Sequence, residues 1–460
     1  MRTECNAALF DFVAIGRREV VADFDGGSIT SDAGGLLLGQ ADRALGLVEQ
    51  FAGCFQDYRD PELIEHTVRT LVGQRVFGLA LGYEDLNDHD ELRHDPVMAV
   101  LAGKLKARRK GCAPVAGKST LNRLELSTAV PSTYHKIAHD PAAIEGLFIE
   151  LFLRGFAQAP EEIMLDLDAT DDPLHGTQEG RFFHGHYDCY CYLPLYIFCG
   201  TQLLAAKLRP SNIDGAAGAQ EEVARIVARI RMSWPATRIV LRADSGFARD
   251  ALMSWCEDNG VDYIFGLARN ARLTAQIGEQ MASAALESVD TGKPARRFVD
   301  FTWCTLKSWS RERRVIGKAE WTHDKANPRF IVTTLGQGDG RTLYEQVYCA
   351  RGEMENRIKE CQLDLFADRT STARMAANQL RLWFASMAYV LVESIRRIAL
   401  AATEFAAATC GTIRLKLFKI GAQVTISVRR VKFALASGCP VKAAFALAHR
   451  TLLAAVPGAG

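Results

Sequence analysis

The sequence predicts an α/β protein with a mixed-sheet core that carries helices on its faces, plus a mostly helical N-terminal region. Between residues 162 and 268, short apolar runs that end in acids alternate with amphipathic stretches. Up to about residue 158, apolar side chains recur mainly at helical spacing. The length of 460 residues allows roughly two to four domains, each with its own core.

The N-terminal region is expected to begin with a hairpin and continue as helices. Alternation of apolar and polar residues across 17–30 predicts a hairpin that turns at Asp25-Gly26-Gly27. Ser31 and Asp32 are expected to cap a helix that reaches about Leu45. Apolar periodicity predicts further helices over 61–81, 92–105, 119–126 and 141–156.

The pattern changes to that of a sheet at Glu162. Strands are predicted at 163–168, 190–199, 202–208, 238–244 and 262–267. Helices are predicted at 216–232 and 248–259. Three successive strands followed by strand–helix alternation are typical of a mixed sheet covered by helices.

The C-terminal part alternates between strand-like and helical segments. Strands are predicted at 297–308, 314–321 and 329–335, the first two forming a β-rich insertion that contains Trp303, Trp309 and Trp321. Helices are predicted at 344–361 and 373–400. The ranges 412–419 and 422–435 are expected to form a basic hairpin that turns at Gly421.

Charge is distributed unevenly although the formal net charge is only +1. Seven basic residues stand against one acid between Leu101 and Ser127, and no acid follows Glu404, where eight basic residues occur. Six acids fall between Glu161 and Asp172. Basic patches beside a concentrated acidic site suit a polyanion held over bound cations, although solvated faces would explain any one patch alone.

One helix places polar side chains along a single stripe. Tyr348, Arg351, Glu355, Lys359 and Gln362 fall within an arc of about 80° at ~100° per residue. The adjoining apolar stripe consists of Val347, Met354, Ile358 and Cys361, and the far side of Gln346, Glu353, Arg357 and Glu360. Such a helix packs by one edge and presents a carboxylate between phosphate-binding groups on the next.

Two further acids, Asp168 and Asp244, follow predicted strands that would be neighbours in the sheet. With Glu355 they would form a three-carboxylate site for two Mg²⁺ or Mn²⁺ ions, which prefer oxygen ligands and catalyse phosphodiester displacement. Each acid also has an ordinary explanation. Asp168 could solvate a loop beside Asp166, Asp171 and Asp172, Asp244 could cap a helix, and Glu355 could pair with Arg351 or Lys359.

These motifs together resemble those of bacterial insertion-sequence transposases with an Asp-Asp-Glu site. The resemblance is carried by Asp168-Ala-Thr170, Asp244-Ser-Gly-Phe247 and Tyr348-x-x-Arg351-x-x-x-Glu355. Supporting segments are Phe183–Tyr196, Arg357–Asp368, Gly34–Leu38 and Leu415–Lys419. The likeness covers nearly the whole chain and is greatest to the type called insertion sequence family 1380, a relative of family 4.

The resemblance implies a ribonuclease-H-like core and cut-and-paste transposition. The implied regions are a helical DNA-binding region at 1–158, the core at 159–268 and 329–400, the insertion at 269–328 and a basic segment at 401–460. Asp168, Asp244 and Glu355 would bind two Mg²⁺ or Mn²⁺ ions. Tyr348, Arg351, Lys359 and Gln362 would contact DNA phosphates. Gln362 departs from the family 4 pattern, which often has a lysine there, so this contact would lack charge.

The predicted partners are double-stranded DNA, both element ends and target, and a second copy of the chain on that DNA. Lys118 and the tail residues Arg429 and Arg430 are further candidates for phosphate contacts. An insertion tryptophan could stack on a displaced base, or all three could be core. Two alternatives stay open: a metal-dependent nuclease on the same core, which would not join strands, and a catalytically inert DNA-binding protein.

Other motifs are better explained as structural. His184, His186, Cys189 and Cys191 lack a second pair at zinc spacing. Gly117-Lys-Ser119 lacks the spacing of a nucleotide-binding loop, so no nucleotide cofactor is expected. Twelve cysteines without a C-x-x-C pair, no long apolar run and no signal pattern predict a cytoplasmic protein without membrane segments, located at the nucleoid when bound to DNA.

Overall fold

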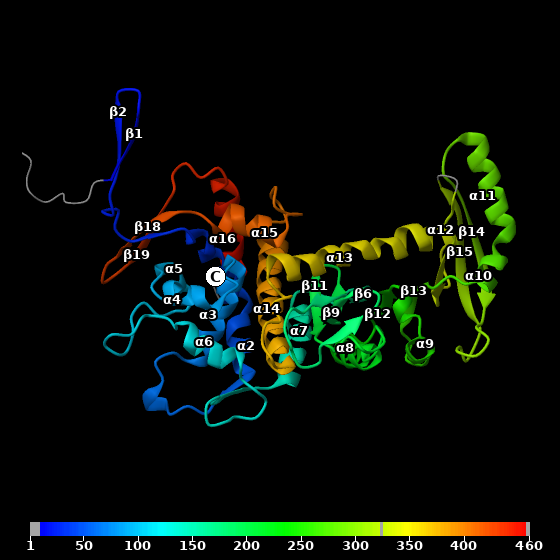
Figure 1. Ribbon diagram of the computed structural model, residues 1–460, viewed down its shortest axis with the longest axis horizontal. Helices are drawn as coiled ribbons and strands as arrows, with labels where there is room; N and C mark the ends of the chain where they lie inside the picture. Colours follow the sequence, from blue (N-terminus) through cyan, green and yellow to red (C-terminus); the bar gives the residue numbers. More distant parts are fainter. Residues whose placement is uncertain (1–9, 323–324, 457–460) are drawn as a thin grey trace, which may run out of the picture. The chain divides into compact units, whose positions relative to one another are not determined.

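The computed structural model describes residues 10–322 and 325–456, which form two compact units (Figure 1). The first unit contains the chain up to residue 48, 60–122 and the chain from 394 onward. The second unit contains 49–59 and 123–393. The predicted region 1–158 is therefore divided between the units, and the C-terminal segment belongs with the N-terminal residues rather than standing alone.

The second unit is built around a mixed sheet with the strand order β11-β10-β6-β12-β13-β17-β15-β14, and β16 pairs with β15. These strands are β6 (Glu162–Ala169), β10 (Leu195–Cys199), β11 (Gln202–Lys207), β12 (Arg238–Ala243), β13 (Asp262–Leu267), β14 (Ala295–Trp303), β15 (Arg313–Thr322), β16 (Lys325–Ala326) and β17 (Arg329–Thr333). β12 is parallel to both β6 and β13, and the other pairings are antiparallel. The predicted mixed α/β architecture is confirmed, and the carboxyl ends of β6, β12 and β13 share one edge.

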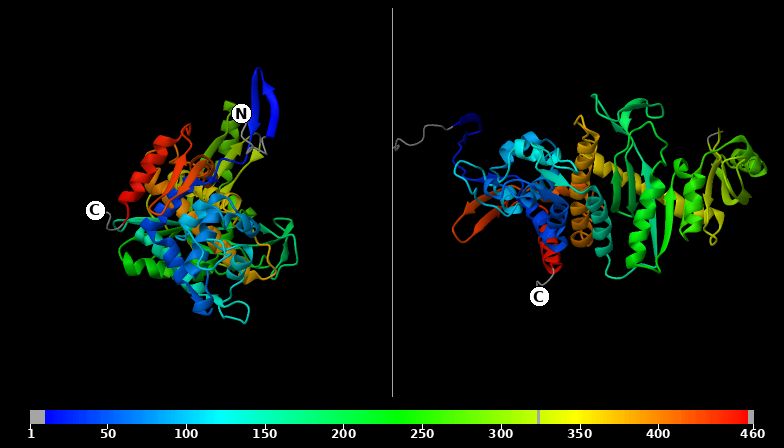
Figure 2. Two further views of the ribbon diagram at one scale, coloured as in Figure 1. Left: turned by 90° about the vertical axis from the view of Figure 1, so that its left-hand side faces the viewer. Right: turned by 90° about the horizontal axis from the view of Figure 1, so that it is seen from below.

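Both faces of this sheet are buried because alternate side chains of each central strand face opposite helical layers. Leu165 and Leu241 pack with α8 (Ala219–Ser233) and α9 (Asp250–Asp258). Val240 and Ile264 pack instead with the helical segment that begins at α12 (Gly340–Thr342). The green helices α8 and α9 and the yellow segment around α13 (Gly352–Lys359) can be followed in Figures 1 and 2.

The region between β13 and β17 differs from the predicted β-rich insertion. It contains two helices that the sequence pattern did not indicate, α10 (Ala271–Gln276) and α11 (Gly278–Thr291). The predicted strands are present as β14 and β15, and they extend the central sheet through β17. α11 was missed because its buried stripe is short, with Met281 and Ala284 buried while Leu286 and Val289 are exposed.

Further elements complete the second unit. They are β4 (Phe55–Asp57), β5 (Ile137–His139), α7 (Pro141–Arg154), β7 (Asp172–Pro173), β8 (Phe182–His184), β9 (Cys189–Tyr192) and α14 (Met375–Ala399). The predicted strand 190–199 is interrupted at Leu193-Pro194, because proline cannot donate to a ladder. α14 packs on the β10–β11 hairpin, where the Tyr389 hydroxyl donates to the Thr201 carbonyl at 2.7 Å. The chain passes between the units within α2 (Leu47–Gly53), α6 (Lys118–Glu125) and α14, whose residues from 394 onward belong to the first unit.

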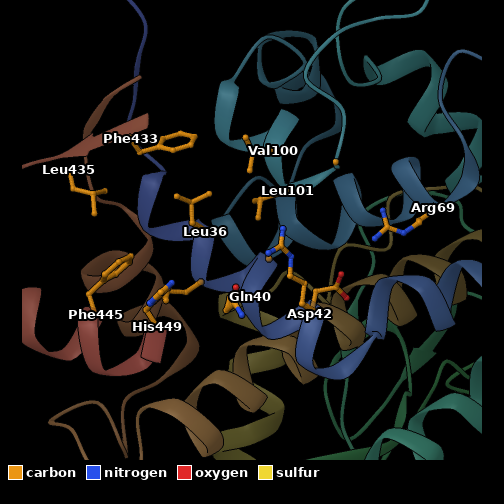
Figure 3. A pocket seen from close by; sticks show the side chains of 14 residues that line it. Leu36, Gln40, Asp42, Arg69, Val100, Leu101, Phe433, Leu435, Phe445 and His449 are labelled. Atoms are coloured by element: carbon orange, nitrogen blue, oxygen red, sulfur yellow. The ribbon is translucent and has the colours of Figure 1, made fainter. Parts of the chain in front are cut away.

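The first unit is mostly helical and has a small sheet of order β19-β18-β3. Its elements are β1 (Phe10–Ile15), β2 (Arg18–Ala22), β3 (Ile29–Thr30), α1 (Leu36–Leu45), α3 (Val68–Leu81), α4 (His89–Leu92), α5 (Pro96–Leu101), α15 (Cys410–Ile413), β18 (Ala422–Ile426), β19 (Val431–Leu435) and α16 (Lys442–Ala454). A pocket of about 350 Å³ in this unit has Leu36, Phe433 and Phe445 toward one end and Asp42 and Arg69 toward the other (Figure 3).

Two predicted hairpins lie elsewhere than expected. The N-terminal hairpin is formed by β1 and β2 and turns at Gly16-Arg17, whereas β3 pairs with β18. The positive φ of 63° at Gly16 suits glycine and explains this turn. Residues 410–418 are helical, so the basic hairpin consists of β18 and β19 alone. No helix among the described residues is long and apolar enough to cross a membrane.

Candidate metal and DNA site

The two predicted aspartates lie side by side at the carboxyl edge of the central sheet. Asp168 is near the end of β6, and Asp244 follows β12 directly. The parallel register pairs Leu167 with Ala243, so the next residue on each strand is an aspartate. Their carboxylates are tied to nearby backbone: Oδ1 of Asp168 accepts from the N–H of Ala169 at 3.0 Å, and Oδ1 of Asp244 from the N–H of Gly246 at 2.8 Å.

Glu355 lies on α13, which packs against β6. The apolar stripe of this helix is buried as predicted, with Met354, Ile358 and Cys361 all at most 3% exposed. The helix is not uniform, because Leu343–Tyr348 and Glu360–Asp364 have π-helical spacing. Such segments turn less per residue than an α-helix. Glu360, expected on the far side, is buried and pairs with Arg357 at 2.6 Å.

Arg351 connects the helix to the sheet edge. Its Nη1 lies 3.5 Å from Oδ2 of Asp168, and its Nη2 donates to Oε1 of Glu355 at 3.0 Å. One guanidinium therefore bridges two of the three predicted metal ligands. Burial lowers the pKa of Arg351, but the charges of Asp168, Asp244 and Glu355 act against it, and the pKa is raised overall.

The electrostatics of Asp168 show that the three carboxylates are close enough to interact. Burial is the largest cause that raises the pKa of Asp168 to about 7; the charge of Arg351 opposes this rise, and the charges of Asp244 and Glu355 add to it. Like charges that share a site disfavour ionisation in this way, and a bound cation would relieve the repulsion. The site is thus short of positive charge even with Arg351 in place.

Tyr348 extends the site along the helix. A Cβ on Gly266, at the end of β13, would lie 2.5 Å from the Tyr348 hydroxyl oxygen and 2.8 Å from the nitrogen of Ser245. Glycine at this position therefore lets the tyrosine approach the loop of Asp244. Burial raises the pKa of Tyr348, and the charge of Asp244 adds to this effect.

The donor chemistry fits a divalent cation, although the described conformation is not a closed metal cage. Among the residues that the structure describes, no three His, Cys, Asp or Glu side chains are grouped tightly enough to hold one ion. Arg351 occupies the space between Asp168 and Glu355. The three carboxylates supply the oxygen ligands that Mg²⁺ prefers, and their mutual repulsion favours a cation between them.

The remaining predicted DNA contacts are placed on both units. Lys359 is exposed on α13, and the side-chain nitrogen of Gln362 donates to the Asp171 carbonyl at 3.0 Å. In the first unit, Lys118 begins α6 and pairs with Asp90 at 3.4 Å. Arg429 and Arg430 are exposed in the turn between β18 and β19.

The insertion tryptophans are mainly core residues. Trp303 and Trp309 are 6% and 9% exposed, and the Arg272 guanidinium lies 4.5 Å from the centre of the Trp303 ring. Trp321 is half-buried against the same core. None of the three offers an exposed ring face on which a DNA base could stack. Packing in the protein core is therefore enough to explain their presence.

Several basic residues near the site were not indicated by the sequence. A pocket of about 220 Å³ is lined by Arg269, Arg329 and Ser245, the residue after Asp244. Arg269 makes no ion pair with any described residue.

Arg242 is buried on β12 and pairs with Asp166. The sequence could have indicated a role for Arg242, because a charged residue within an apolar strand needs a buried partner of opposite charge. The position of Arg329 depends on the β13–β17 pairing, which no local pattern reveals.

The sequence and the structure are each similar to known proteins. The structure is similar to a piggyBac transposase in a synaptic complex with hairpin DNA, solved by cryo-EM, with a TM-score of 0.41 and 10% identity over 84% of this chain and 79% of that chain. No curated protein matches the sequence. The sequence matches the family described as transposase DDE domain group 1 over residues 12–457. Because that match spans nearly the whole chain, the protein belongs to the DDE transposase family, group 1.

Proposed function

We propose that this chain is the transposase of an insertion sequence of the family 1380 type. It binds the terminal inverted repeats of its own element, cleaves the ends and joins them to target DNA. The observation that supports this proposal is that Arg351 contacts both Asp168 and Glu355 at the sheet edge where Asp244 follows the neighbouring strand. The order of the strands β11, β10, β6, β12 and β13 supports a ribonuclease-H-like core.

Asp168, Asp244 and Glu355 would hold two Mg²⁺ or Mn²⁺ ions. Such ions activate the oxygen that attacks a phosphodiester and stabilise the oxygen that leaves. The protein supplies no covalent nucleophile in this proposal; water attacks during cleavage and a DNA 3′-hydroxyl during joining. Asp168 and Asp244 lie at the ends of two central strands, and Glu355 lies on a helix packed against one of them, which favours the precise placement that such a displacement requires.

Arg351 would change partners during this reaction. In the described structure its guanidinium contacts Asp168 and Glu355. Once cations neutralise these carboxylates, the guanidinium is free to pair with a DNA phosphate, for which its planar donor fork is suited. Tyr348, Lys359 and Gln362 lie on the same helix, and Arg269 and Arg329 line the pocket beside Ser245, so these residues would hold neighbouring phosphates.

The basic residues of the first unit would provide sequence-independent affinity. Lys118, Arg429 and Arg430 are exposed, and phosphate contacts by such residues release counterions from DNA. A second copy of the chain would be required on the DNA because two element ends must be joined. The alternatives are a metal-dependent nuclease that cleaves without joining, and a binder without catalysis.

The proposal is tested with purified protein, Mg²⁺, a labelled duplex that carries the element end and a supercoiled target. Cleavage followed by strand joining is expected. Asp168→Asn, Asp244→Asn and Glu355→Gln should each reduce cleavage by about a thousandfold or more, because a catalytic cation supplies several kcal/mol of stabilisation. End binding should persist in these variants.

Asp290→Asn, which neutralises an exposed acid on α11, is the matched control and should cleave normally. Cleavage without joining by the unaltered protein would favour the nuclease. Binding with neither product would favour the inert binder. Normal cleavage by any one of the three variants would remove that residue from the metal site.

A further inference from the structure

Two charged residues inside the central sheet form a buried pair directly behind the two aspartates of the site. Arg242 on β12 and Asp166 on β6 are directly opposite each other in the parallel register. Arg242 precedes Asp244 by two residues, and Asp166 precedes Asp168 by two. The pair is bidentate, with Nε–Oδ1 at 2.5 Å and Nη2–Oδ2 at 2.8 Å. Arg242 is 9% exposed and Asp166 is 2% exposed.

The third nitrogen of the same guanidinium reaches the helix that carries Glu355. Nη1 of Arg242 donates to the backbone carbonyl of Val347 at 2.6 Å. Val347 lies in the π-helical segment Leu343–Tyr348, immediately before Tyr348 and one turn before Arg351. The regular bonding pattern changes where this segment passes into tighter 3₁₀ spacing at Cys349–Arg351, and a side-chain donor is well suited to a carbonyl at such an irregularity.

We infer that Arg242 is a positioning residue that fixes the Glu355 helix to the strands of Asp168 and Asp244. This inference rests on the proposed function. Asp166 holds two of the guanidinium nitrogens, so the third has a defined direction relative to both strands. The Val347 carbonyl is bound in that direction, about two helical turns before Glu355. Arg242 thereby ties all three ligand-bearing segments together at one point without contacting DNA or metal.

The chemistry of the pair supports a role in geometry rather than in stability. Burying two charges is costly, and well-packed apolar residues often stabilise a fold as much or more. An apolar pair would fill the same space but could not hold the Val347 carbonyl. Lysine could pair with Asp166 but lacks the rigid fork that makes three directed bonds at once.

The test compares two double variants on the same pair of strands. Arg242→Met with Asp166→Leu removes the buried pair. Arg238→Met with Glu162→Leu removes the opposite pair at the other end of β12 and β6, where Arg238 Nη1 lies 2.9 Å from Glu162 Oε2. Thermal unfolding, affinity for the element-end duplex, cleavage rate and the Mg²⁺ concentration for half-maximal rate are measured for the full chain.

The inference predicts a selective effect on metal-dependent cleavage. The Arg242/Asp166 variant should unfold near the wild-type temperature and bind DNA within about twofold of wild type. It should cleave roughly 10–100-fold more slowly and require more Mg²⁺, since small displacements of a catalytic group cost rates of this order. The Arg238/Glu162 variant should match wild type in rate and Mg²⁺ requirement.

Arg242→Lys is a second test in case the double variant does not fold, because lysine keeps a positive charge paired with Asp166. It should remain folded and bind DNA, yet need more Mg²⁺ than wild type. A wild-type rate and Mg²⁺ requirement in either a folded double variant or Arg242→Lys would overturn the inference. If the wild-type protein itself neither cleaves nor joins DNA, the proposed function fails and the inference fails with it; normal wild-type cleavage with unaffected variants refutes the inference alone.

Discussion

Arg351 Nη1 lies 3.5 Å from Asp168 Oδ2, so a cationic side chain lies beside a proposed metal ligand. The same guanidinium contacts Glu355 at 3.0 Å. The carboxylates are therefore partly neutralised from within the protein, and any bound cation must compete with this arginine. This relationship makes metal binding and the position of Arg351 interdependent.

Arg351→Gln should tighten metal binding to the DNA-free protein while slowing cleavage. Without the guanidinium, Asp168 and Glu355 lose their competing cation, and the affinity for Mn²⁺ should rise several-fold at pH 8.5. The cleavage rate should fall by about tenfold or more because a charge-assisted phosphate contact is lost. Lys359→Gln, which removes an exposed charge from the same helix, is the control for Mn²⁺ binding and should leave it unchanged. Weaker Mn²⁺ binding by Arg351→Gln would contradict this account.

Asp172 should make the protein less stable as pH rises. It is 1% exposed, its Oδ2 has no hydrogen-bond partner among the described residues, and burial together with Asp368 raises its pKa from 3.8 to about 8. Between these pH values the folded chain keeps a proton that the unfolded chain releases, so the free energy of unfolding falls as pH increases from about 4 to 8. Asp172→Asn should flatten this dependence in urea unfolding at pH 5 and pH 8. An unchanged slope in the variant would contradict the assignment, and Asp290→Asn should behave like wild type.

The basic hairpin β18–β19 should contribute phosphate contacts. Replacing Arg429 and Arg430 with glutamine should weaken DNA binding similarly for all sequences. Each lost phosphate contact reduces the slope of log affinity against log salt by about 0.9, so the double variant should lower it by about 2. Arg17→Gln with Arg18→Gln, at the turn of the hairpin β1–β2, removes the same charge from the same unit. Equal slopes for both double variants would argue against a specific role for β18–β19.

Gly34 should be essential for the fold of the first unit. A Cβ at this position would lie 1.8 Å from the carbonyl oxygen of Leu417 and 2.9 Å from the Cα of Phe418, and neither backbone atom can move aside easily. Gly34→Ala should lower the free energy of unfolding by about 1–3 kcal/mol or more. A Cβ on Gly421 would meet no atom within 4 Å, so Gly421→Ala should have little effect in the same chemical-denaturation experiment. A wild-type midpoint for Gly34→Ala would show that the two segments are not packed this closely.

The sequence indicates which acids to group at the candidate site but not which residues surround them. Asp168 and Asp244 could be placed together because parallel neighbours end at one edge, and the stripe on the helix placed Glu355. The contact between Arg351 and Asp168 could not be predicted, because helical periodicity shows which face of the helix carries Arg351 but not which residue that face meets. The π-helical segments and the burial of Glu360 both depend on tertiary packing that local propensity does not encode.

The division of the chain into two compact units could not be predicted from local sequence patterns either. Residues 401–460 were expected to form a basic C-terminal segment, yet β18 pairs with β3 and the chain near Leu417 packs on Gly34. Such contacts join residues almost 400 positions apart, and nothing in either local pattern indicates them. α11 was missed for a different reason, because its buried face is small.

The proposed function requires three carboxylates that bind cations together. Electron paramagnetic resonance of Mn²⁺ bound to the protein with its element-end duplex measures this directly. Wild-type protein should bind two spin-coupled ions, and Asp168→Asn, Asp244→Asn and Glu355→Gln should each reduce or abolish that binding while the duplex stays bound. Undiminished coupled Mn²⁺ in any of the three variants would show that the carboxylate in question lies outside the metal site and would contradict the account.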